Sequence, residues 1–311
     1  MAMRIVFMGS AEFGIPSLKA IQHSEHKLSG IVSTPARPKG RGLKLIPSPV
    51  AGYARANELS PVMTPAKMKD ASFREQLLDL APDIFIVIAF RILPESIYTI
   101  PQRGTYNLHA SLLPKYRGPA PIQWCLVNGE NETGITVFKI NAGIDTGNIL
   151  LQKSLPVSND ETAPQLYDRL ANLGAAGIAE SLEILTKANP DFKKQDDSQA
   201  TPAPKLTKED GRMDWRMTAD ELYNRIRAFK PFPGTYAMLN GKRISIISAR
   251  PAESGTASAP GAISRVARDR VVVSCGAGEL HILEVKPEGK RNMMVRDFLN
   301  GAELREGMLL Q

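Results

Sequence analysis

Two polar side chains that could assist a reaction lie one residue apart in the stretch YNLHASLLPKYRGPAPIQW, residues 106–124. Asn107 carries an amide that can donate a hydrogen bond to a carbonyl oxygen, and His109 carries the side chain that exchanges protons most readily near neutral pH. At the end of a β-strand, residues i and i+2 point to the same face. Prolines restrict the backbone that follows and Gly118 permits sharp bends, so we expect an irregular segment there, unlike a strand or a helix.

A carboxylate occurs in a second irregular segment. Asp145 lies between Gly143 and Gly147, after a predicted strand. In a parallel sheet, loops that follow neighbouring strands meet above the same edge, so Asn107, His109 and Asp145 can form one polar site. A histidine at a strand end is more often structural, and an aspartate between glycines more often bonds its own backbone in a turn. Spacing alone leaves both interpretations open.

The N-terminal half alternates short apolar runs with helix-like segments. The apolar runs predict buried strands at 3–8, 26–33, 83–89, 104–110 and 132–140. The segments between them predict helices at 15–24, 48–58 and 72–81. This alternation predicts an α/β fold with a Rossmann-like, mostly parallel sheet that is covered on both faces. Active sites of such sheets lie beyond the carboxyl ends of the strands, which is where Asn107 and His109 fall.

The chain changes character after a long predicted helix at 162–187, where a segment rich in Pro, Asp, Lys and Gln follows. The predicted organisation is a first domain at 1–188, a linker at 189–206 and a smaller domain at 207–311. In the smaller domain, Thr218 is a candidate N-cap of a helix, and the Asn-Gly pair at 240–241 predicts a β-hairpin. Several short strands divided by turns predict a β-barrel that is OB-like.

Composition and charge narrow the class of protein. An apolar share of 43% and a charged share of 23% are ordinary for a folded globular protein. No stretch approaches the roughly 20 apolar residues that cross a bilayer, so we expect no membrane partner and a cytoplasmic location. Cys125 and Cys275 have no metal-ligand spacing and are expected to be reduced, buried thiols. The net charge of +7 comes mostly from residues 201–311, which hold 18 Lys and Arg against 13 Asp and Glu, and this suits a polyanionic partner.

The segments NLHASLLPKYRGPAPIQW and ETGITVFKINAGIDTGNIL together closely resemble the signature of the 10-formyltetrahydrofolate-dependent formyltransferases. The resemblance implies that Asn107, His109 and Asp145 are the catalytic residues. It implies that 10-formyltetrahydrofolate is the formyl donor and that no metal is needed. The residues implied to contact the folate are Ser111, Leu112, Leu113 and Pro114.

The residue types suit the chemistry that this resemblance implies. An amine that attacks the formyl carbon drives negative charge onto the carbonyl oxygen, and that charge calls for preorganised hydrogen-bond donors. The amide of Asn107 and a protonated His109 can supply them. Asp145 can stabilise the charged imidazole and help to move protons through water.

A basic tract follows the second predicted strand. The segment TPARPKGRGLKLIPSPV holds four positive charges, no acid and two glycines. Such a tract suits a phosphate backbone, although a solvated surface loop can have the same composition. It closely resembles the loop with which some members of the family read tRNA. The residues that this resemblance assigns to tRNA binding are Lys39, Arg41 and Lys44.

The resemblance extends over nearly the whole chain through the segments KLTKEDGRMDW, IRAFKPFPGTY and PEGKRNM. The glycinamide ribonucleotide formyltransferases lack this second domain. The resemblance therefore implies transfer of the formyl group to the amino group of methionine on initiator methionyl-tRNA, for translation initiation. We expect the chain to act as a monomer.

Two other functions stay open. An enzyme of the same chemistry could formylate a sugar nucleotide or hydrolyse the formyl donor, but neither needs a basic tract. A non-catalytic nucleic-acid-binding protein could use the barrel, but this leaves the candidate catalytic residues unexplained. Two segments depart from common patterns. AFRILP at 89–94 lacks a glycine that many relatives have in a loop beside the folate, and GSAEFG at 9–14 does not match the dinucleotide-binding pattern G-x-G-x-x-G.

Overall fold

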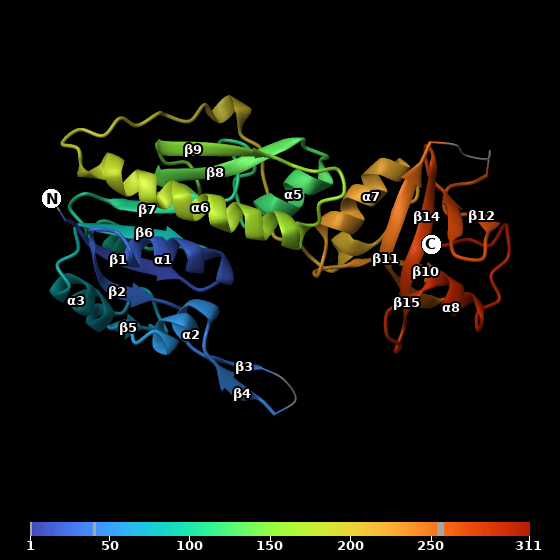
Figure 1. The fold of residues 1–311 in the computed structure, drawn as a ribbon, viewed down its shortest axis with the longest axis horizontal. Helices are drawn as coiled ribbons and strands as arrows, with labels where there is room; N and C mark the ends of the chain where they lie inside the picture. The colour runs from blue at the N-terminus through green and yellow to red at the C-terminus, as the bar shows by residue number, and fades with distance from the viewer. Residues whose placement is uncertain (1, 40–41, 254–257) are drawn as a thin grey trace. The chain divides into compact units, whose positions relative to one another are not determined.

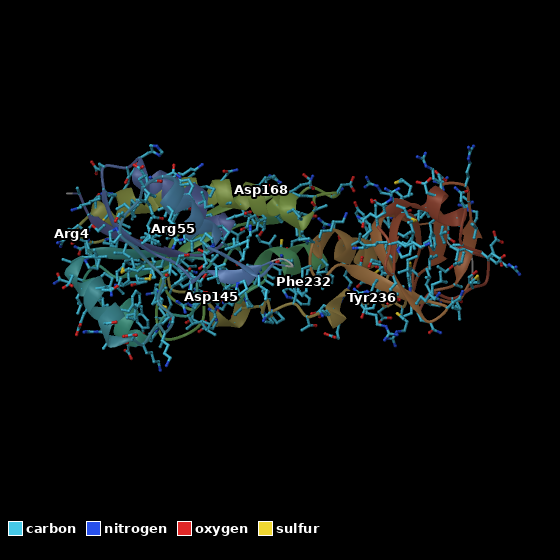
Figure 2. All side chains as sticks on the ribbon, turned by 90° about the horizontal axis from the view of Figure 1, so that it is seen from below. Arg4, Arg55, Asp145, Asp168, Phe232 and Tyr236 are labelled. Carbon is cyan, nitrogen blue, oxygen red and sulfur yellow. The ribbon has the colours of Figure 1, made fainter. Side chains whose placement is uncertain are left out.

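The computed structural model describes residues 2–39, 42–253 and 258–311, and the chain forms two compact units (Figure 1). The first unit comprises Met1–Pro121, Glu132–Pro156 and Tyr167–Ala203. The second unit comprises Ile122–Asn131, Val157–Leu166 and Pro204–Gln311. Figure 2 shows the side chains of both units, with Asp145 on the first and Tyr236 on the second. The boundaries 1–188, 189–206 and 207–311 stay a prediction.

The first unit is built on a seven-stranded sheet in the order β5-β2-β1-β6-β7-β8-β9. The strands are β1 (Arg4–Gly9), β2 (Lys27–Val32), β5 (Val62–Met63), β6 (Ile84–Ile88), β7 (Thr105–His109), β8 (Glu132–Lys139) and β9 (Ile149–Pro156). The five adjacent strands from β5 to β7 are parallel to one another, and β8 is antiparallel to both β7 and β9. The predicted α/β, mostly parallel fold is confirmed. The sequence prediction missed β5, which has two residues, and β9, which is a partly exposed edge strand.

Burial on both faces explains why the central strands form. All five residues of β6 are buried, as are the last five of β1, and continuous apolar runs of this kind are typical of parallel sheets. The helices of this unit are α1 (Ile15–Gln22), α2 (Pro49–Ala56), α3 (Ala71–Asp79), α4 (Glu95–Tyr98) and most of α6 (Ala163–Thr186). The short 3₁₀ helices are η1 (Glu12–Gly14) and η2 (Asp197–Gln199).

Helix α6 covers one face of the sheet beside β7 and β8 (Figure 1). A Cβ atom at Gly174 would lie 2.6 Å from the Leu108 side chain, and one at Gly177 would lie 2.7 Å from Ile135. These glycines therefore let the helix approach the sheet closely. Since Leu108 faces α6, its neighbours Asn107 and His109 face the opposite side.

The second unit contains an antiparallel sheet in the order β10-β11-β14-β13-β12, with β15 paired to β14. The strands are β10 (Thr235–Leu239), β11 (Lys242–Ala252), β12 (Ile263–Val266), β13 (Val271–Ser274), β14 (Glu279–Pro287) and β15 (Met293–Met294). The helices are α5 (Pro121–Val127, of which all but Pro121 belongs here), η3 (Glu209–Gly211), α7 (Ala219–Ala228) and α8 (Val295–Leu299). Helix α5 lies in a stretch that we expected to be irregular, so that expectation was wrong at its end.

The last residues of the chain join the two ends of this sheet. The backbones of Met238 and Gln311 exchange two hydrogen bonds, and Leu310 donates to the carbonyl of Gly261. The expected small barrel is confirmed, although the sequence prediction did not include this closing segment. The predicted hairpin at 240–241 is also confirmed, because Asn240 and Gly241 both have positive φ and connect β10 to β11.

Cys125 and Cys275 are buried and form no disulfide, as expected. Burial raises the pKa of the Cys275 thiol to about 12, so this group stays protonated at neutral pH. In the parts of the chain that the structure describes, no helix is long and apolar enough to cross a membrane.

Helix α7 begins with the predicted N-cap. The hydroxyl of Thr218 accepts a hydrogen bond from the backbone amide of Glu221, and the carboxylate of Glu221 accepts one from the backbone amide of Thr218. This reciprocal capping box satisfies two amides that would otherwise lack partners at the start of the helix.

Replacing Thr218 with Ala should lower the free energy of unfolding of the second unit by about 1 kcal/mol, because the cap is lost. Urea titration followed by tryptophan fluorescence measures this, since Trp124 and Trp215 both belong to the second unit. Thr218→Ser keeps the hydroxyl and should unfold near the wild-type midpoint. Equal midpoints for the Ala and Ser variants would contradict the assigned cap.

Candidate active site

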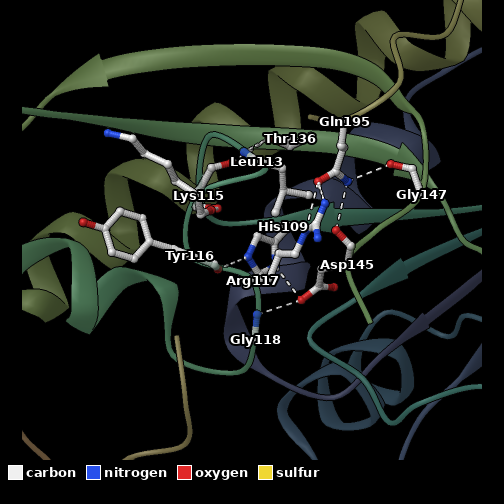
Figure 3. A network of polar contacts seen from close by, with 11 residues as sticks. His109, Leu113, Lys115, Tyr116, Arg117, Gly118, Thr136, Asp145, Gly147 and Gln195 are labelled. Carbon is white, nitrogen blue, oxygen red and sulfur yellow. Dashed lines mark hydrogen bonds and ion pairs between the residues drawn. The ribbon is translucent and has the colours of Figure 1, made fainter. Parts of the chain in front are cut away.

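Strand β7 brings Asn107 and His109 to one face of the sheet. Asp145 comes from another loop and faces His109 (Figure 3). His109 is only 7% exposed, and Asp145 is 16% exposed. The imidazole Nδ1 lies 3.7 Å from Oδ2 of Asp145, and Nε2 lies 2.8 Å from the carbonyl oxygen of Tyr116. The structure thus places together the histidine and the carboxylate that the sequence motif predicts.

The contacts of His109 determine where its protons lie. A backbone carbonyl only accepts hydrogen bonds, so Nε2 carries the hydrogen that points to Tyr116. The proton that completes the imidazolium therefore sits on Nδ1, the nitrogen that faces Asp145. A hydrogen on Nδ1 thus has the Asp145 carboxylate as its neighbour, with 3.7 Å between Nδ1 and Oδ2.

The loop after β7 is held from beneath by Thr136 of β8. The Thr136 hydroxyl donates to the carbonyl of Ser111 and accepts from the backbone amide of Leu113. Gln152 of β9 donates to the carbonyl of Leu113 and to the same hydroxyl. The backbone polar groups at this turn are satisfied by neighbouring strands, which fixes the loop against the sheet.

The route by which Asp145 reaches His109 differs from the one we expected. We expected two loops at the carboxyl ends of parallel strands, but β8 is antiparallel to β7. The carboxyl end of β8 therefore lies at the amino end of β7, where the amide of Ile140 donates to the carbonyl of Thr105. The segment 140–148 folds back from there, and that return brings Asp145 to His109.

Local backbone geometry makes this return possible. Asp145 has a φ of 55°, in the left-handed region that favours glycine. A Cβ atom at Gly147 would lie 1.7 Å from the carbonyl oxygen of Lys139, so only glycine fits there. The Oδ2 atom of Asp145 accepts a 2.9 Å hydrogen bond from the backbone amide of Gly118. Asp145 is therefore a residue that joins two loops, and not one that caps its own turn.

Asn107 differs from its neighbours because its side-chain amide is open, which means that it has no hydrogen-bond partner among the described residues. Its side chain is half-buried, and within the described residues it makes no hydrogen bond. It shares the face of β7 with His109, as the i, i+2 spacing predicts. An unpartnered amide beside a proton-exchanging histidine suits an oxygen atom that gains negative charge during a reaction.

The residues predicted to contact folate fall into two groups. Ser111 and Leu113 are buried, and the Ser111 hydroxyl donates to the carbonyl of Lys115. Leu112 and Pro114 are half-buried, so their side chains are the ones available to a ligand. A Cβ atom at Gly134 would lie 2.7 Å from the Leu112 side chain, which therefore lies over β8. Contact between any of these residues and a folate stays a prediction.

The basic tract forms a two-stranded antiparallel hairpin. Strand β3 (Arg37–Lys39) pairs with β4 (Lys44–Ile46), with Lys39 opposite Lys44. Lys44 is exposed, and Leu43 and Leu45 beside it are 71% and 70% exposed. Arg41 lies outside the residues that the structure describes.

Sequence reasoning missed residues that support the site from other segments. Gln195 and Arg117 hydrogen-bond to each other, and Gln195 also contacts the backbone of Asp145. Arg117 lies inside the unusual stretch after β7, which is a signal that could have drawn attention to it. Gln195 falls in the predicted linker, where composition gives no such signal. Among the described residues, no group of three His, Cys, Asp or Glu side chains could hold a metal ion.

The chain is similar to known proteins along most of its length. Residues 3–182 match the family model "Formyl transferase", and residues 205–303 match "Formyl transferase, C-terminal domain". The methionyl-tRNA formyltransferase of Geobacter sulfurreducens is 43% identical over 99% of this chain and 96% of its own length. The structure of methionyl-tRNA formyltransferase from Clostridium thermocellum gives a TM-score of 0.56 at 18% identity, covering 80% of this chain and 93% of that one. HypX from Aquifex aeolicus in complex with tetrahydrofolic acid gives 0.64 at 17% identity, covering 100% of this chain and 51% of that one.

The two solved structures are distant in sequence, so they show a common fold and nothing finer. The sequence matches carry more, because the first family model spans more than half of the chain and the Geobacter relative is similar along almost its full length. They agree with the family that the motifs around His109 and Asp145 indicate. The chain belongs to the formyl transferase family.

Proposed function

We propose that this chain transfers the formyl group of 10-formyltetrahydrofolate to the amino group of methionine on initiator methionyl-tRNA, for translation initiation. The observation that carries the proposal is the open amide of Asn107 beside His109, whose Nδ1 faces Asp145. The acceptor is supported by the 43% identity with a methionyl-tRNA formyltransferase over nearly the whole chain. A cytoplasmic location and a monomeric state belong to the same proposal.

The proposed roles follow from the positions of the side chains. Asn107 donates to the formyl oxygen as the amine attacks, and His109 donates from Nδ1 to the same region of negative charge. Asp145 stabilises the imidazolium and helps to carry the proton that the amine loses toward the folate nitrogen that must gain one. These steps need no covalent bond to the enzyme.

A formylation assay with defined acceptors tests the proposal. The protein is mixed with 10-formyltetrahydrofolate and with methionyl-tRNA, free methionine or an amino-sugar nucleotide. We expect rapid formylation of methionyl-tRNA only. Formylation of the sugar nucleotide, or release of formate without an acceptor, would contradict the proposed acceptor. Either result would still support chemistry on the formyl group.

Replacing Asn107, His109 or Asp145 with Ala should lower the single-turnover formylation rate by about 100-fold or more, because oxyanion donors and acid–base groups contribute on that scale. Asn131→Ala, which removes an exposed amide, is the matched control and should react at the normal rate. A near-normal rate for His109→Ala in folded protein would contradict the assigned roles.

Replacing Leu112 with Asn should raise the dissociation constant of a reduced folate about tenfold, because the change removes part of an apolar wall. Titration calorimetry is the suitable measurement, since both tryptophans lie in the second unit. Leu155→Asn is the matched control and should bind folate with normal affinity. It changes a half-buried leucine of β9 that pairs with Thr133 and faces away from the site. Unchanged folate affinity in the Leu112 variant, or tight binding of a nicotinamide dinucleotide instead of folate, would contradict the predicted folate site.

Arg41→Leu should strongly lower formylation of methionyl-tRNA and leave folate affinity unchanged, because the hairpin is proposed to hold the acceptor end of the tRNA. Lys39→Ala and Lys44→Ala should cause milder losses and a weaker dependence of tRNA binding on salt. Lys69→Ala removes one exposed charge elsewhere and serves as the control. Rates measured at several salt concentrations separate the variants, and normal kinetics for Arg41→Leu would remove the hairpin from the proposed tRNA site.

A further inference from the structure

The chain segment 193–203 is attached to both loops of the candidate site. Lys193 and Ile149 exchange two backbone hydrogen bonds of 2.8 Å at the end of the Asp145 loop. At the other end, the amide of Arg117 donates to the carbonyl of Thr201, and the amide of Ala203 donates to the carbonyl of Arg117. This segment therefore crosses from one loop to the other within the first unit.

Gln195 lies near the start of this segment and is 6% exposed. Its Nε2 donates to the carbonyl of Asp145 at 2.9 Å and to that of Gly147 at 2.7 Å. Its Oε1 accepts from Nε and Nη2 of Arg117 at 3.1 and 2.7 Å (Figure 3). Both hydrogens and both lone pairs of the amide are thus in use.

We propose that Gln195 is a positioning residue that sets the distance between Asp145 and His109. The inference rests on the proposed function of the same site. Gln195 holds the backbone of the Asp145 loop with its nitrogen and the Arg117 side of the other loop with its oxygen. The next residue after Arg117 is Gly118, whose amide holds the Asp145 carboxylate. A single buried amide therefore links the two segments between which the catalytic contact forms.

Asp145 needs such support because its own backbone conformation is unfavourable. A left-handed φ costs free energy in a residue other than glycine, and such a conformation persists when surrounding contacts determine it. The two carbonyls bound by Gln195 flank Thr146 and belong to this strained turn. Without the donors, the turn can relax and carry the carboxylate away from Nδ1 of His109.

The chemistry of the link distinguishes glutamine from its closest replacement. Glutamate has the same length and can still pair with Arg117, but its ionised carboxylate has no hydrogen to donate to the two carbonyls. Arg117 also pairs with Asp197 at 2.6 Å, so its guanidinium keeps one partner in every Gln195 variant. Gln195→Glu therefore removes the hold on the Asp145 turn while keeping the volume and the Arg117 contact.

The test is steady-state and single-turnover formylation by Gln195→Glu and Gln195→Ala in the full chain. We expect kcat to fall about 10- to 100-fold, because small misplacement of a catalytic group costs that much, while KM for both substrates changes less than threefold. Gln199→Ala removes an exposed amide of the same segment and should behave like the wild type.

A double variant separates positioning from general damage. In an Asp145→Asn background, Gln195→Glu should cause almost no further loss, because the group that it positions has already been removed. Full additivity of the two losses would overturn the proposal, as would a normal kcat in both Gln195 variants. If wild-type protein formylates an acceptor other than methionyl-tRNA, the proposed function fails, but the same comparison with that acceptor still decides the role of Gln195.

Discussion

The hydrogen bond from the Gly118 amide to the Asp145 carboxylate joins the two loops of the site. Three unusual backbone positions allow the loops to come close enough for it to form. Gly118 has a φ of 127°, and a Cβ atom there would lie 2.5 Å from the carbonyl oxygen of Ala203. Asp145 takes a left-handed conformation, and Gly147 passes against the backbone of Lys139. Each of these positions lets one loop come close enough to the other for a carboxylate to face His109.

Most polar groups around this contact have hydrogen-bond partners, and the side-chain amide of Asn107 is open. Four side chains form hydrogen bonds with neighbouring backbone or side-chain groups, namely those of Ser111, Thr136, Gln152 and Gln195. The side-chain amide of Asn107 is left open, and Nδ1 of His109 faces the Asp145 carboxylate. Such an arrangement lowers the reorganisation needed during a reaction, because the supports are already in place before charge develops. The site thus has the character of a preorganised donor pair on a rigid frame.

Much of the frame could be predicted from the sequence, because buried parallel strands and turn residues leave local patterns. The apolar runs of β1 and β6, the Asn-Gly hairpin and the Thr218 cap are examples. The reversed direction of β8 could not be predicted, since a strand that is buried on both faces looks the same in either direction. Gln195 could not be found either, because its partners lie about 50 and about 80 positions away and its own segment resembles a linker.

Residues 193–203 are hydrogen-bonded to both loops, so the smallest complete site includes this segment. The first family model ends at residue 182, and the composition of the chain suggested a boundary at 188. A fragment cut at either place would contain Asn107, His109 and Asp145 but lack Gln195. The compact unit itself continues to Ala203. The end of an excised fragment must therefore be set by the hydrogen bonds of residues 193–203 and not by the end of sequence similarity.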